Sequence, residues 1–568
     1  MRNLAIVLML VAGAVMGFAG AEGEGSSAGD FTLSPPGTYP VVEPTYEFDV
    51  VTIYLSHESS GRPGDSKFSA FLEDLTNVRV NFVDVIESGA AGEKINLMLA
   101  SGDLPDVLMT PFHINAQTTY QHGVTGTFQR LNELIDSHMP ALKRELEKWP
   151  QYQAQLTMPD GGIYNLPELE AGCFHCRFQI KFWMYKPWFD KLGLEFPPTT
   201  TDELYEVLKA FKEGDPNGNG IADEIPMLGA STGWNALPLN FIMNAFTYTR
   251  RGTYGGYLER MPDSMRFVAN TPEWREGLRY LHRLYDEGLI GRETFTQKND
   301  QAKATIENPD IELVGSFPAG WFGVMTVNGG GTGRFADFKP IAPLKGPAGA
   351  QHTTYFPPQI RYHTFITAAE EHPEIVAQWA NWFYEDPLVN GNLGMDFLEE
   401  GVHWRYLTAE EKTKGYVARD GSPAVTWPLE TKTYGEVKRD DGWSRTTLRW
   451  GPVGTRALPP EFANDPSKQE WILMVTTRDM YQPLLKENYV PANLVFDEDV
   501  QDELADLTAT IAGGTGLVEQ WSTEFIVGSR DIDDQGQWDT YVNELERAGV
   551  ERYVQIWEDT LRNAGYVN

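Results

Sequence analysis

The chain has 568 residues, of which 41% are hydrophobic and 22% are charged, so it is long enough for more than one hydrophobic core and has the composition of a globular protein. Its formal net charge is -34. Because nucleic acids and anionic lipids are bound by clustered lysines and arginines, this charge argues against both as partners.

The first residues have the pattern of an export signal. The apolar run Leu4–Phe18 follows one arginine, and Ala19-Gly20-Ala21 supplies the small residues of a cleavage site, which predicts a signal peptide over residues 1–21. The apolar run is shorter than the ~20 residues that a membrane-spanning helix needs. Residues 22–45 are rich in glycine, serine, proline and acids, which predicts a flexible leader. We therefore expect an exported protein.

Ordered structure is predicted to begin at Tyr46. β-Branched and aromatic runs predict strands from Tyr46, over Val78–Val85 and at Val107, and apolar residues at helical spacing predict helices near Phe68 and Glu93. This β-α-β-α-β order implies a parallel sheet with right-handed crossovers and places the chain in the α/β class.

Three later segments also have clear patterns. Asn270–Leu289 is typical of an amphipathic helix, with Thr271 as its N-cap. Gly315–Val327 predicts a strand preceded by an aromatic loop, and Ala368–Glu385 predicts a further helix.

The two cysteines of the chain, Cys173 and Cys176, are separated by two residues. In an exported protein such a pair most simply forms a local structural disulfide. A thioredoxin-type redox pair would place the first cysteine at a helix start behind a strand, and Y-N-L-P-E-L-E-A-G precedes this pair. A zinc site would need two more ligands.

Residues 215–226, D-P-N-G-N-G-I-A-D-E-I-P, have oxygen-bearing side chains at alternate positions. Calcium takes six to eight oxygen ligands, and a coiled loop supplies them from alternate residues. The loop is not the helix-loop-helix motif, because its twelfth position is Pro226 where that motif has glutamate. A polar turn is the alternative, since asparagine, glycine and aspartate dominate turns. The ordered alternation favours Ca²⁺, with ligands from Asp215, Asn217, Asn219 and the carbonyl of Ile221, and with either Asp223 or Glu224 to complete the set.

The stretch from Lys181 through this loop, K-F-W-M-Y-K-P-W-F-D-K-L-G-L-E-F-P-P-T-T-T-D-E-L-Y-E-V-L and onward, resembles the extracellular solute-binding proteins of ABC importers. The similarity is to their large calcium-binding branch, related to oligosaccharide- and alginate-binding proteins. Further segments, among them Gly391–Trp404 and a terminal helical signature over Phe525–Val550, also resemble this family. Its members often carry a lipid-modified cysteine just after the signal, whereas no cysteine precedes Cys173 here.

The resemblance implies a two-lobed periplasmic binding protein fold of type II, with hinge-linked lobes and a central cleft. Lobe 1 would contain residues 46–168 and 360–430, and lobe 2 residues 169–359 and 431–568. The resemblance also implies a structural Ca²⁺ ion, held in the matching loop by Asp215, Asn217, Asn219, Asp223, Glu224 and the carbonyl of Ile221. It further implies a monomer that delivers its solute to permease subunits, and a periplasmic or extracellular location.

Ligands of open parallel sheets bind beyond the carboxyl ends of the strands, and pockets between domains are common. His57, Glu58 and Asp106 are expected at such a rim, although turn or capping roles would equally suit the two acids. Sugars need aromatic and planar polar groups, and the aromatic candidates on predicted loops are Trp183, Trp234, Trp321, Tyr355 and Trp404. Since tryptophan and tyrosine are mostly buried, each could instead belong to the core, where we place Trp379 and Trp382. Arg361 could pair with a solute carboxylate or form an ordinary ion pair.

Three classes of function remain open at this point. A secreted glycoside hydrolase would need two carboxyl groups about 5–5.5 Å or 6.5–9.5 Å apart, which a sequence cannot reveal. A calcium-stabilised adhesion protein would be expected to repeat its metal loop, and only one is present. The pattern favours a non-enzymatic binder that captures a carbohydrate, most simply an oligosaccharide, over peptides and other polar solutes.

Overall fold

The computed structural model describes most of the chain: residues 31–54, 63–110, 113–170, 174–251, 255–327, 331–357, 359–386, 390, 401, 404–416, 423–429, 441–443, 446–448, 450, 469–486, 488–491, 494–496 and 498–567. The predicted signal peptide, the candidates His57 and Glu58, and Cys173 lie outside these residues, as does most of the 391–404 segment.

Lobe 1 is built on a five-stranded sheet with the order β4-β3-β5-β12-β6. β3 pairs in parallel with both β4 and β5, and β12 pairs antiparallel with β5 and β6. The predicted strand-helix alternation after Tyr46 is therefore confirmed. The strands are β3 (Tyr46–Tyr54), β4 (Val78–Glu87), β5 (Val107–Met109), β6 (Leu166–Glu170) and β12 (Gln359–Ile366).

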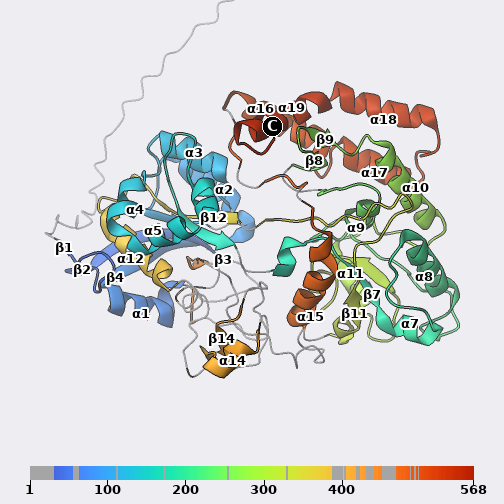
Figure 1. Cartoon of the computed structure of the whole chain (residues 1–568), viewed down its shortest axis with the longest axis horizontal. Helices are drawn as coiled ribbons and strands as arrows, with labels where there is room; N and C mark the ends of the chain where they lie inside the picture. Colours follow the sequence, from blue (N-terminus) through green and yellow to red (C-terminus); the bar gives the residue numbers. More distant parts are fainter. Residues whose placement is uncertain are drawn as a thin grey trace, which may run out of the picture.

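Helices surround this sheet (Figure 1). Phe48 of β3 packs edge-on against Trp379, with ring centroids 5.2 Å apart. Trp379 and Trp382 are 0% and 5% exposed, which confirms their placement in the core. The helices of lobe 1 are α1 (Lys67–Thr76), α2 (Ser88–Ser101), α3 (Ala116–Val124), α4 (Asn132–His138), α5 (Pro140–Lys148), α6 (Pro150–Leu156) and α12 (Pro373–Glu385).

Ordered structure begins earlier than predicted. β1 (Thr32–Leu33) pairs with β2 (Val42–Glu43), so the expectation of a flexible leader is wrong for residues 31–45. Val41 and Val42 are buried, and the amide of Val41 donates to the carbonyl of Thr76 over 2.8 Å. The polar composition of the segment hid these two apolar side chains, whose burial holds it against lobe 1.

Lobe 2 contains a three-stranded antiparallel sheet in which β7 (Phe182–Tyr185) lies between β10 (Ser316–Pro318) and β11 (Phe338–Pro340). α10 (Pro272–Asp286) begins after Thr271, whose hydroxyl caps it as predicted, and it buries Trp274, Leu278 and Leu281. The other lobe 2 elements before the C-terminal helices are α7 (Lys186–Leu192), α8 (Thr201–Glu213), α9 (Pro238–Ile242), α11 (Asn299–Ile306), β8 (Leu258–Arg260) and β9 (Met265–Phe267).

The predicted strand over Gly315–Val327 is shorter than expected. Only Ser316–Pro318 is a strand, and the aromatic residues follow it instead of preceding it, partly in a 3₁₀ turn over Phe322–Val324. Proline cannot donate to a ladder and glycine weakens strands, so Pro318 and Gly320 explain this early end.

Among the segments that cross between the lobes are one after β6 and one before β12. They lie side by side, because the amide of Phe356 donates to the carbonyl of Arg177 over 2.8 Å and the rings of Phe178 and Tyr355 are 5.2 Å apart. Phe178 also belongs to a small buried cluster with Tyr481, on the side of α15 (Gln469–Thr476).

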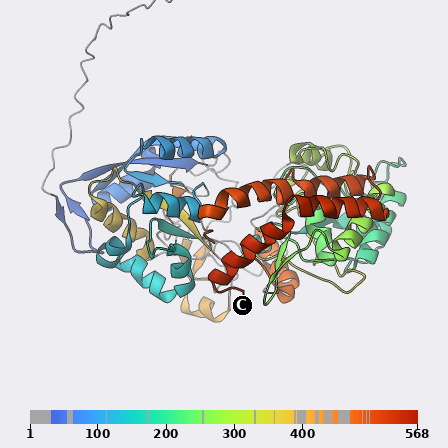
Figure 2. The same ribbon diagram turned by 90° about the horizontal axis from the view of Figure 1, so that it is seen from above.

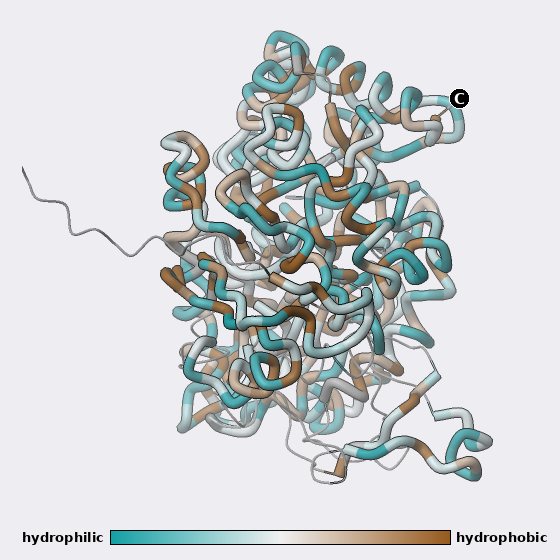
Figure 3. Tube along the Cα trace, turned by 90° about the vertical axis from the view of Figure 1, so that its left-hand side faces the viewer, coloured by the Kyte–Doolittle hydropathy of each residue, from teal (hydrophilic) through white to brown (hydrophobic). Residues whose placement is uncertain are grey.

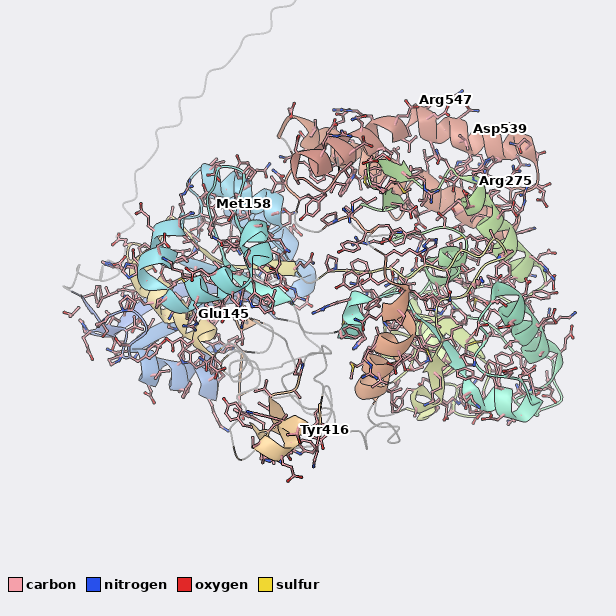
Figure 4. All side chains as sticks on the ribbon, in the orientation of Figure 1. Glu145, Met158, Arg275, Tyr416, Asp539 and Arg547 are labelled. Atoms are coloured by element: carbon pink, nitrogen blue, oxygen red, sulfur yellow. The ribbon has the colours of Figure 1, made fainter. Side chains whose placement is uncertain are left out.

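The predicted lobe boundary at residue 431 is wrong. Trp443, Leu448 and Trp450 are buried in the core of lobe 1. The indole of Trp450 donates to the carboxylate of Glu145, which is labelled in Figure 4, over 3.2 Å. The chain therefore returns to lobe 1 before its last passage into lobe 2, an excursion that short local patterns do not reveal. β13 (Trp404–Tyr406), α14 (Ala409–Thr413) and β14 (Thr426–Pro428) precede this return.

The C-terminal helices complete lobe 2, as the terminal signature predicts. Arg275 of α10 (Figure 4) donates to the side chain of Gln535 over 2.6 Å and to the carbonyl of Ile532. Figure 2 shows the helices extending along lobe 2 toward lobe 1, where the amide of Phe496 donates to Gln117 of α3 over 3.2 Å. They are α16 (Glu498–Leu507), α17 (Leu517–Val527), α18 (Gln535–Arg547) and α19 (Val550–Asn563).

The hydropathy of the trace follows this arrangement. In Figure 3 the peripheral helices alternate between hydrophilic and hydrophobic stretches, as expected of helices with one face on a core. Within the described residues, none of the helices has both the length and the apolar character needed to span a membrane.

Candidate functional site

The inner edge of the lobe 2 sheet lies next to the crossing segments. β7 starts directly after the first crossing, so its amino end lies beside the hinge. The neighbouring strands are antiparallel to β7 and end at the same edge. The amide of Ala319 donates to the carbonyl of Lys181 over 3.2 Å, and that of Ile341 to the carbonyl of Phe182 over 3.0 Å. Residues at this edge therefore lie beside the segments that join the two lobes.

The loop of residues 229–237, called the Trp234 loop below, projects from this edge. Its base is closed by a hydrogen bond of 2.9 Å from the amide of Ala230 to the carbonyl of Ala236. Gly233 and Asn235 have φ angles of 98° and 56°, in the left-handed region, on either side of Trp234. This backbone turns the indole of Trp234 outward, and the residue is 38% exposed.

The Trp234 indole is held in a defined position. A Cβ atom on Gly320 would lie only 2.5 Å from its Cδ2 atom, so one face of the ring covers this glycine. The indole Nε1 donates to Oε1 of Gln179 over 3.2 Å, and the amide of Gly320 donates to the carbonyl of Trp234 over 2.8 Å. A fixed, partly exposed aromatic ring beside an amide side chain is suited to binding the apolar faces and hydroxyl groups of sugars.

Two of the other aromatic candidates are core residues. Trp183 is 1% exposed in the central strand β7, where its Nε1 donates to the carbonyl of Ala319 over 3.0 Å. Trp404 is 7% exposed in β13. The expectation that both lie on binding loops is wrong, because each is part of a strand whose neighbours cover it.

Trp321 and Tyr355 are half-buried. The ring of Trp321 lies against Gly323 and Phe322 in lobe 2. Tyr355 lies in the second crossing segment, with Phe178 on one side and Tyr489 on the other, at ring distances of 5.2 and 5.4 Å. Tyr355 is thus placed beside the hinge, and both residues stay predictions as ligand contacts.

Arg361 of β12 is engaged in an ion pair. Its Nη1 lies 3.2 Å from Oε2 of Glu168, and the two side chains are 10% and 1% exposed. A carboxylate from the protein thus already balances the guanidinium, which favours the ion-pair alternative over pairing with a solute carboxylate.

Asp106 lies at the wrong edge of the lobe 1 sheet to face the solute. It precedes β5, and its carboxylate accepts a hydrogen bond of 2.8 Å from the amide of Asp49, near the start of β3. Burial raises the pKa of this carboxyl group. The carboxyl ends of the parallel strands face the opposite way, so its assignment to the cleft rim is wrong.

A cavity of about 490 Å³ in lobe 1 lies apart from these candidates. It is bounded by α1, the amino-terminal half of β4 and Trp443. Arg79 in its wall is paired with Glu47 and Glu73. None of the predicted solute-binding residues that lie within the described ranges lines it.

The 215–226 loop coils around its own oxygen atoms. Oδ1 of Asp215 accepts from the amides of Gly218 and Asn219, and Oδ2 from the amide of Gly220, each over 3.0 Å. Oδ1 of Asn219 accepts from the amide of Ile221 over 2.6 Å. Gly218 and Gly220 have φ angles of 77° and 73°, the left-handed conformation that such coiling requires.

The remaining oxygens of the loop fit a cation in part. Oε1 of Glu224 is buried and has no hydrogen-bond partner in the described part of the chain. The side-chain amides of Asn217 and Asn219 donate to Asp223, and the amide of Asp223 donates to the carbonyl of Ile221. No group of three or more histidine, cysteine, aspartate or glutamate side chains among the described residues is arranged to hold a metal. The possible oxygen ligands in the loop are carboxylates, side-chain amides and a backbone carbonyl, which are the ligand types that calcium prefers.

Cys176 takes part in a disulfide bond. The other cysteine of the sequence, Cys173, lies outside the described residues, so the local pairing stays a prediction.

Sequence reasoning missed Gln179 and Gly320, which fix the Trp234 indole. Neither carries a recognisable signal, because each acts through a residue that is distant in the sequence. Asn235 was also missed, although an asparagine after Gly-Trp in a loop is a common left-handed turn residue.

Comparison with known proteins identifies the class. The family model of the bacterial extracellular solute-binding proteins matches residues 58–388, more than half of the chain. The chain therefore belongs to this family. Membership confirms the predicted two-lobed α/β fold, the location outside the cytoplasm and the class of binding protein, and it does not support the hydrolase alternative.

One relative matches nearly the whole chain. It is 29% identical over 566 residues to the fructooligosaccharide ABC transporter substrate-binding protein FusA of Streptococcus pneumoniae, with 97% of this chain and 96% of FusA covered. The structure of FusA with kestose has a TM-score of 0.68 and 26% identity, covering 91% of this chain and 99% of that one.

Two further structures agree with the fold. An EF-hand mutant of FusA with fructo-nystose has a TM-score of 0.68 at 24% identity, with the same coverage of 91% and 99%. An HMO-binding, ABC-transporter-associated solute-binding protein from Bifidobacterium longum infantis has a TM-score of 0.71 at 19% identity, covering 91% of this chain and 99% of that one.

Proposed function

We propose that this chain captures an oligosaccharide of the fructooligosaccharide type for an ABC importer. The observation that carries the proposal is the similarity to FusA, which extends over 97% of the chain and so includes both lobes. The Trp234 indole supplies a physical basis for it, because it offers a partly exposed ring at the inner edge of lobe 2.

In the proposed mechanism the solute lies between the two lobes, in contact with Trp234. The crossing segments beside Phe356 and Arg177 act as the hinge, and the lobes close around the solute. The closed monomer then docks on permease subunits in the membrane. No group of the protein reacts with the solute in this cycle.

A structural Ca²⁺ ion is proposed for the 215–226 loop. Asp215, Asn217, Asn219, Asp223, Glu224 and the carbonyl of Ile221 would hold it. The buried oxygen of Glu224 and the coiled backbone support this assignment. The ion would offset two of the three negative charges of the loop carboxylates, and its binding to the folded state would stabilise that state.

Calorimetric titration of the purified protein with kestose, in the presence of calcium, tests the proposed function. We expect saturable binding and an unchanged kestose concentration after prolonged incubation. Progressive loss of kestose would favour the glycoside hydrolase. Binding of tri- or tetrapeptides with no response to kestose would favour a peptide binder, and either result would overturn the proposal.

A further inference from the structure

A chain of hydrogen bonds runs through lobe 2 from the C-terminal helices to the Trp234 loop. At its far end Arg251 and Glu519 form an ion pair whose side chains are 13% and 9% exposed. Glu519 lies in the first turn of α17 and also accepts a hydrogen bond from the hydroxyl of Tyr257. The chain of bonds thus starts from a buried charged pair.

The bonds lead from this pair to the indole in four steps. Nη1 of Arg251 donates to Oδ1 of Asn240 over 2.9 Å, and Nδ2 of Asn240 donates to Oδ1 of Asn235 over 3.4 Å. Nδ2 of Asn235 donates to the carbonyl of Gln179 over 3.1 Å. The side chain of Gln179 in turn accepts from Nε1 of Trp234 over 3.2 Å.

The direction of these bonds is set at the charged end. A guanidinium has donors only, so Asn240 must turn its amide oxygen toward Arg251. Its amide nitrogen then faces Asn235, which must present its own oxygen. The nitrogen of Asn235 is left to bond the carbonyl of Gln179. The orientation of each amide therefore follows from the one before it.

The last amide in this series holds a strained backbone. Asn235 has a φ angle of 56°, in the left-handed region that costs a residue with a Cβ atom of order 1 kcal/mol. Its side chain is bonded on both sides, to Asn240 and to Gln179. If these bonds were lost, the residue could relax to an extended conformation, and the adjacent Trp234 would leave its position over Gly320.

Stability alone does not account for a buried charged pair in this place. Taking two charges out of water is costly, and well-packed apolar residues are often at least as stable as a buried ion pair. We propose that Arg251 and Glu519 are positioning residues for solute binding: they fix the amides of Asn240 and Asn235 and so hold the Trp234 indole in its binding position without touching the solute. This inference rests on the proposed function of Trp234.

Arg251→Lys tests the proposal in the full-length protein. Lysine keeps the positive charge opposite Glu519 but lacks the planar fork that bonds Glu519 and Asn240 together. The matched control is Arg266→Lys, because Arg266 forms an ion pair with Glu259 in the same lobe. Labelling with 5-fluorotryptophan and ¹⁹F NMR observes the indole directly, and Trp234→Phe assigns its resonance among the 16 tryptophans.

We expect Arg251→Lys to shift or broaden the Trp234 resonance in the ligand-free protein and to raise the Kd for kestose about fivefold, and Arg266→Lys to do neither. An unmoved resonance would overturn the inference, and so would a moved resonance with unchanged affinity. If the unaltered protein fails to bind kestose, the proposed function fails, while the resonance still decides whether the bond series positions the indole.

A second variant covers the case in which Arg251→Lys does not fold. Asn235→Ala removes the amide next to Trp234 but keeps the Cβ atom, so no side-chain bonds hold the left-handed φ angle of this position. We expect the same shift of the Trp234 resonance and the same loss of affinity. A resonance and a Kd equal to those of the unaltered protein would overturn the inference.

Discussion

Two loops of lobe 2 lie close together in the sequence but are held in different ways. In the 215–226 loop the oxygens of Asp215 bond the amides of residues three to five positions later, so the coil itself is fixed by local bonds. Among the described residues, distant ones bond only near its two ends, where Lys191 donates to the carbonyl of Pro216 and the amide of Ile225 donates to the carbonyl of Leu313. The Trp234 loop depends on three distant segments, through bonds or contacts with Gln179, Asn299 and Gly320.

This difference agrees with the two roles that we propose, stabilisation by the 215–226 loop and solute recognition by the Trp234 loop. A loop with its own hydrogen bonds can keep its shape in many surroundings, and an added cation strengthens it further. A loop held by distant segments has its shape only when the whole lobe is folded. The ring of Trp234, which we propose faces the solute, is therefore coupled to the core, whereas the 215–226 loop is expected to affect stability with little effect on recognition.

The largest expected effect is that of Trp234→Ala. Loss of the ring removes the proposed contact surface for the solute and should raise the Kd for kestose about 100-fold, as for other central aromatic contacts. Titration calorimetry measures the Kd, and thermal unfolding checks that the fold persists.

Trp149→Ala is the matched control for this variant. Trp149 is also 38% exposed, but it lies between α5 and α6 in lobe 1. We expect its affinity for kestose to equal that of the unaltered protein. Equal losses in the two variants would mean that Trp234 has no special part in binding.

Removal of calcium should have the next largest effect, on stability. If the free Ca²⁺ concentration is about 100 times the Kd of the site, a chelator should lower the free energy of unfolding by about 3 kcal/mol. Asp215→Ala should abolish this response, because its carboxylate both binds the ion and organises the loop amides. Thermal unfolding with and without chelator measures the difference.

Asp300→Ala provides the control, since Asp300 is an exposed acid in the first turn of α11. This variant should keep the response to chelator. A melting temperature of the unaltered protein that does not change with chelator would contradict the calcium assignment. An altered affinity for kestose in Asp215→Ala at saturating calcium would contradict the separation of the two loops.

The same contrast explains what could be predicted from the sequence. The helix after Thr271 and the strands from Tyr46 have local signals, hydrophobic periodicity and capping residues, and both are found where predicted. The donor pattern of residues 215–226 is local too, and the structure retains its coiled form. Gln179 and Gly320 have no local signal, since their importance arises only when β7 and β10 bring them to Trp234.

Errors in the candidate site have the same origin. Trp183 lies in β7, whose four residues are all buried. The composition of such a short aromatic strand is the same as that of an aromatic loop, so the sequence does not distinguish them. The sequence predicts Asp106 at the cleft rim because it lies in a turn beside a strand. That turn precedes β5, whereas the carboxyl end of β5 is at Met109, on the opposite edge of the sheet. Periodicity indicates which residues form a strand, but the direction of the sheet decides which end faces the solute.

Gly320→Ala is expected to have an intermediate effect and tests the dependence of Trp234 on distant residues. The added methyl group would overlap the indole, whose Cδ2 atom lies 2.5 Å from the Cβ position, and should displace it. We expect the Kd for kestose to rise about tenfold.

The control is Gly92→Ala in α2, where an added Cβ meets no atom within 4 Å. Alanine at that helical position should leave the affinity unchanged and raise the stability slightly. If Gly320→Ala binds kestose as tightly as Gly92→Ala does, the indole does not need its position over Gly320.

The smallest effect is expected from Glu203→Gln, which removes a capping interaction at the start of α8, the helix that precedes the 215–226 loop. Glu203 forms a capping box with Thr200 at the start of α8. Hydrogen bonds from the amide and hydroxyl of Thr199 lower the pKa of this carboxyl group. Because the group is exposed, we expect the variant to lose only about 0.5 kcal/mol of stability at neutral pH, with no change in the Kd for kestose.

The sign of the pH dependence follows from the lowered pKa. The stabilisation by Glu203 is fully present above the pKa that the group has in the unfolded chain, and it is lost as the pH falls through the lower pKa of the folded state. The difference in unfolding free energy between the two proteins should therefore shrink on acidification below about pH 4. Urea unfolding at pH 7 and pH 3 measures it, with Glu206→Gln on the same helix as a control for the loss of one acidic charge. A difference that is equal at both pH values would show that the carboxylate of Glu203 does not stabilise the start of α8, and that this part of lobe 2 is held by its packing alone.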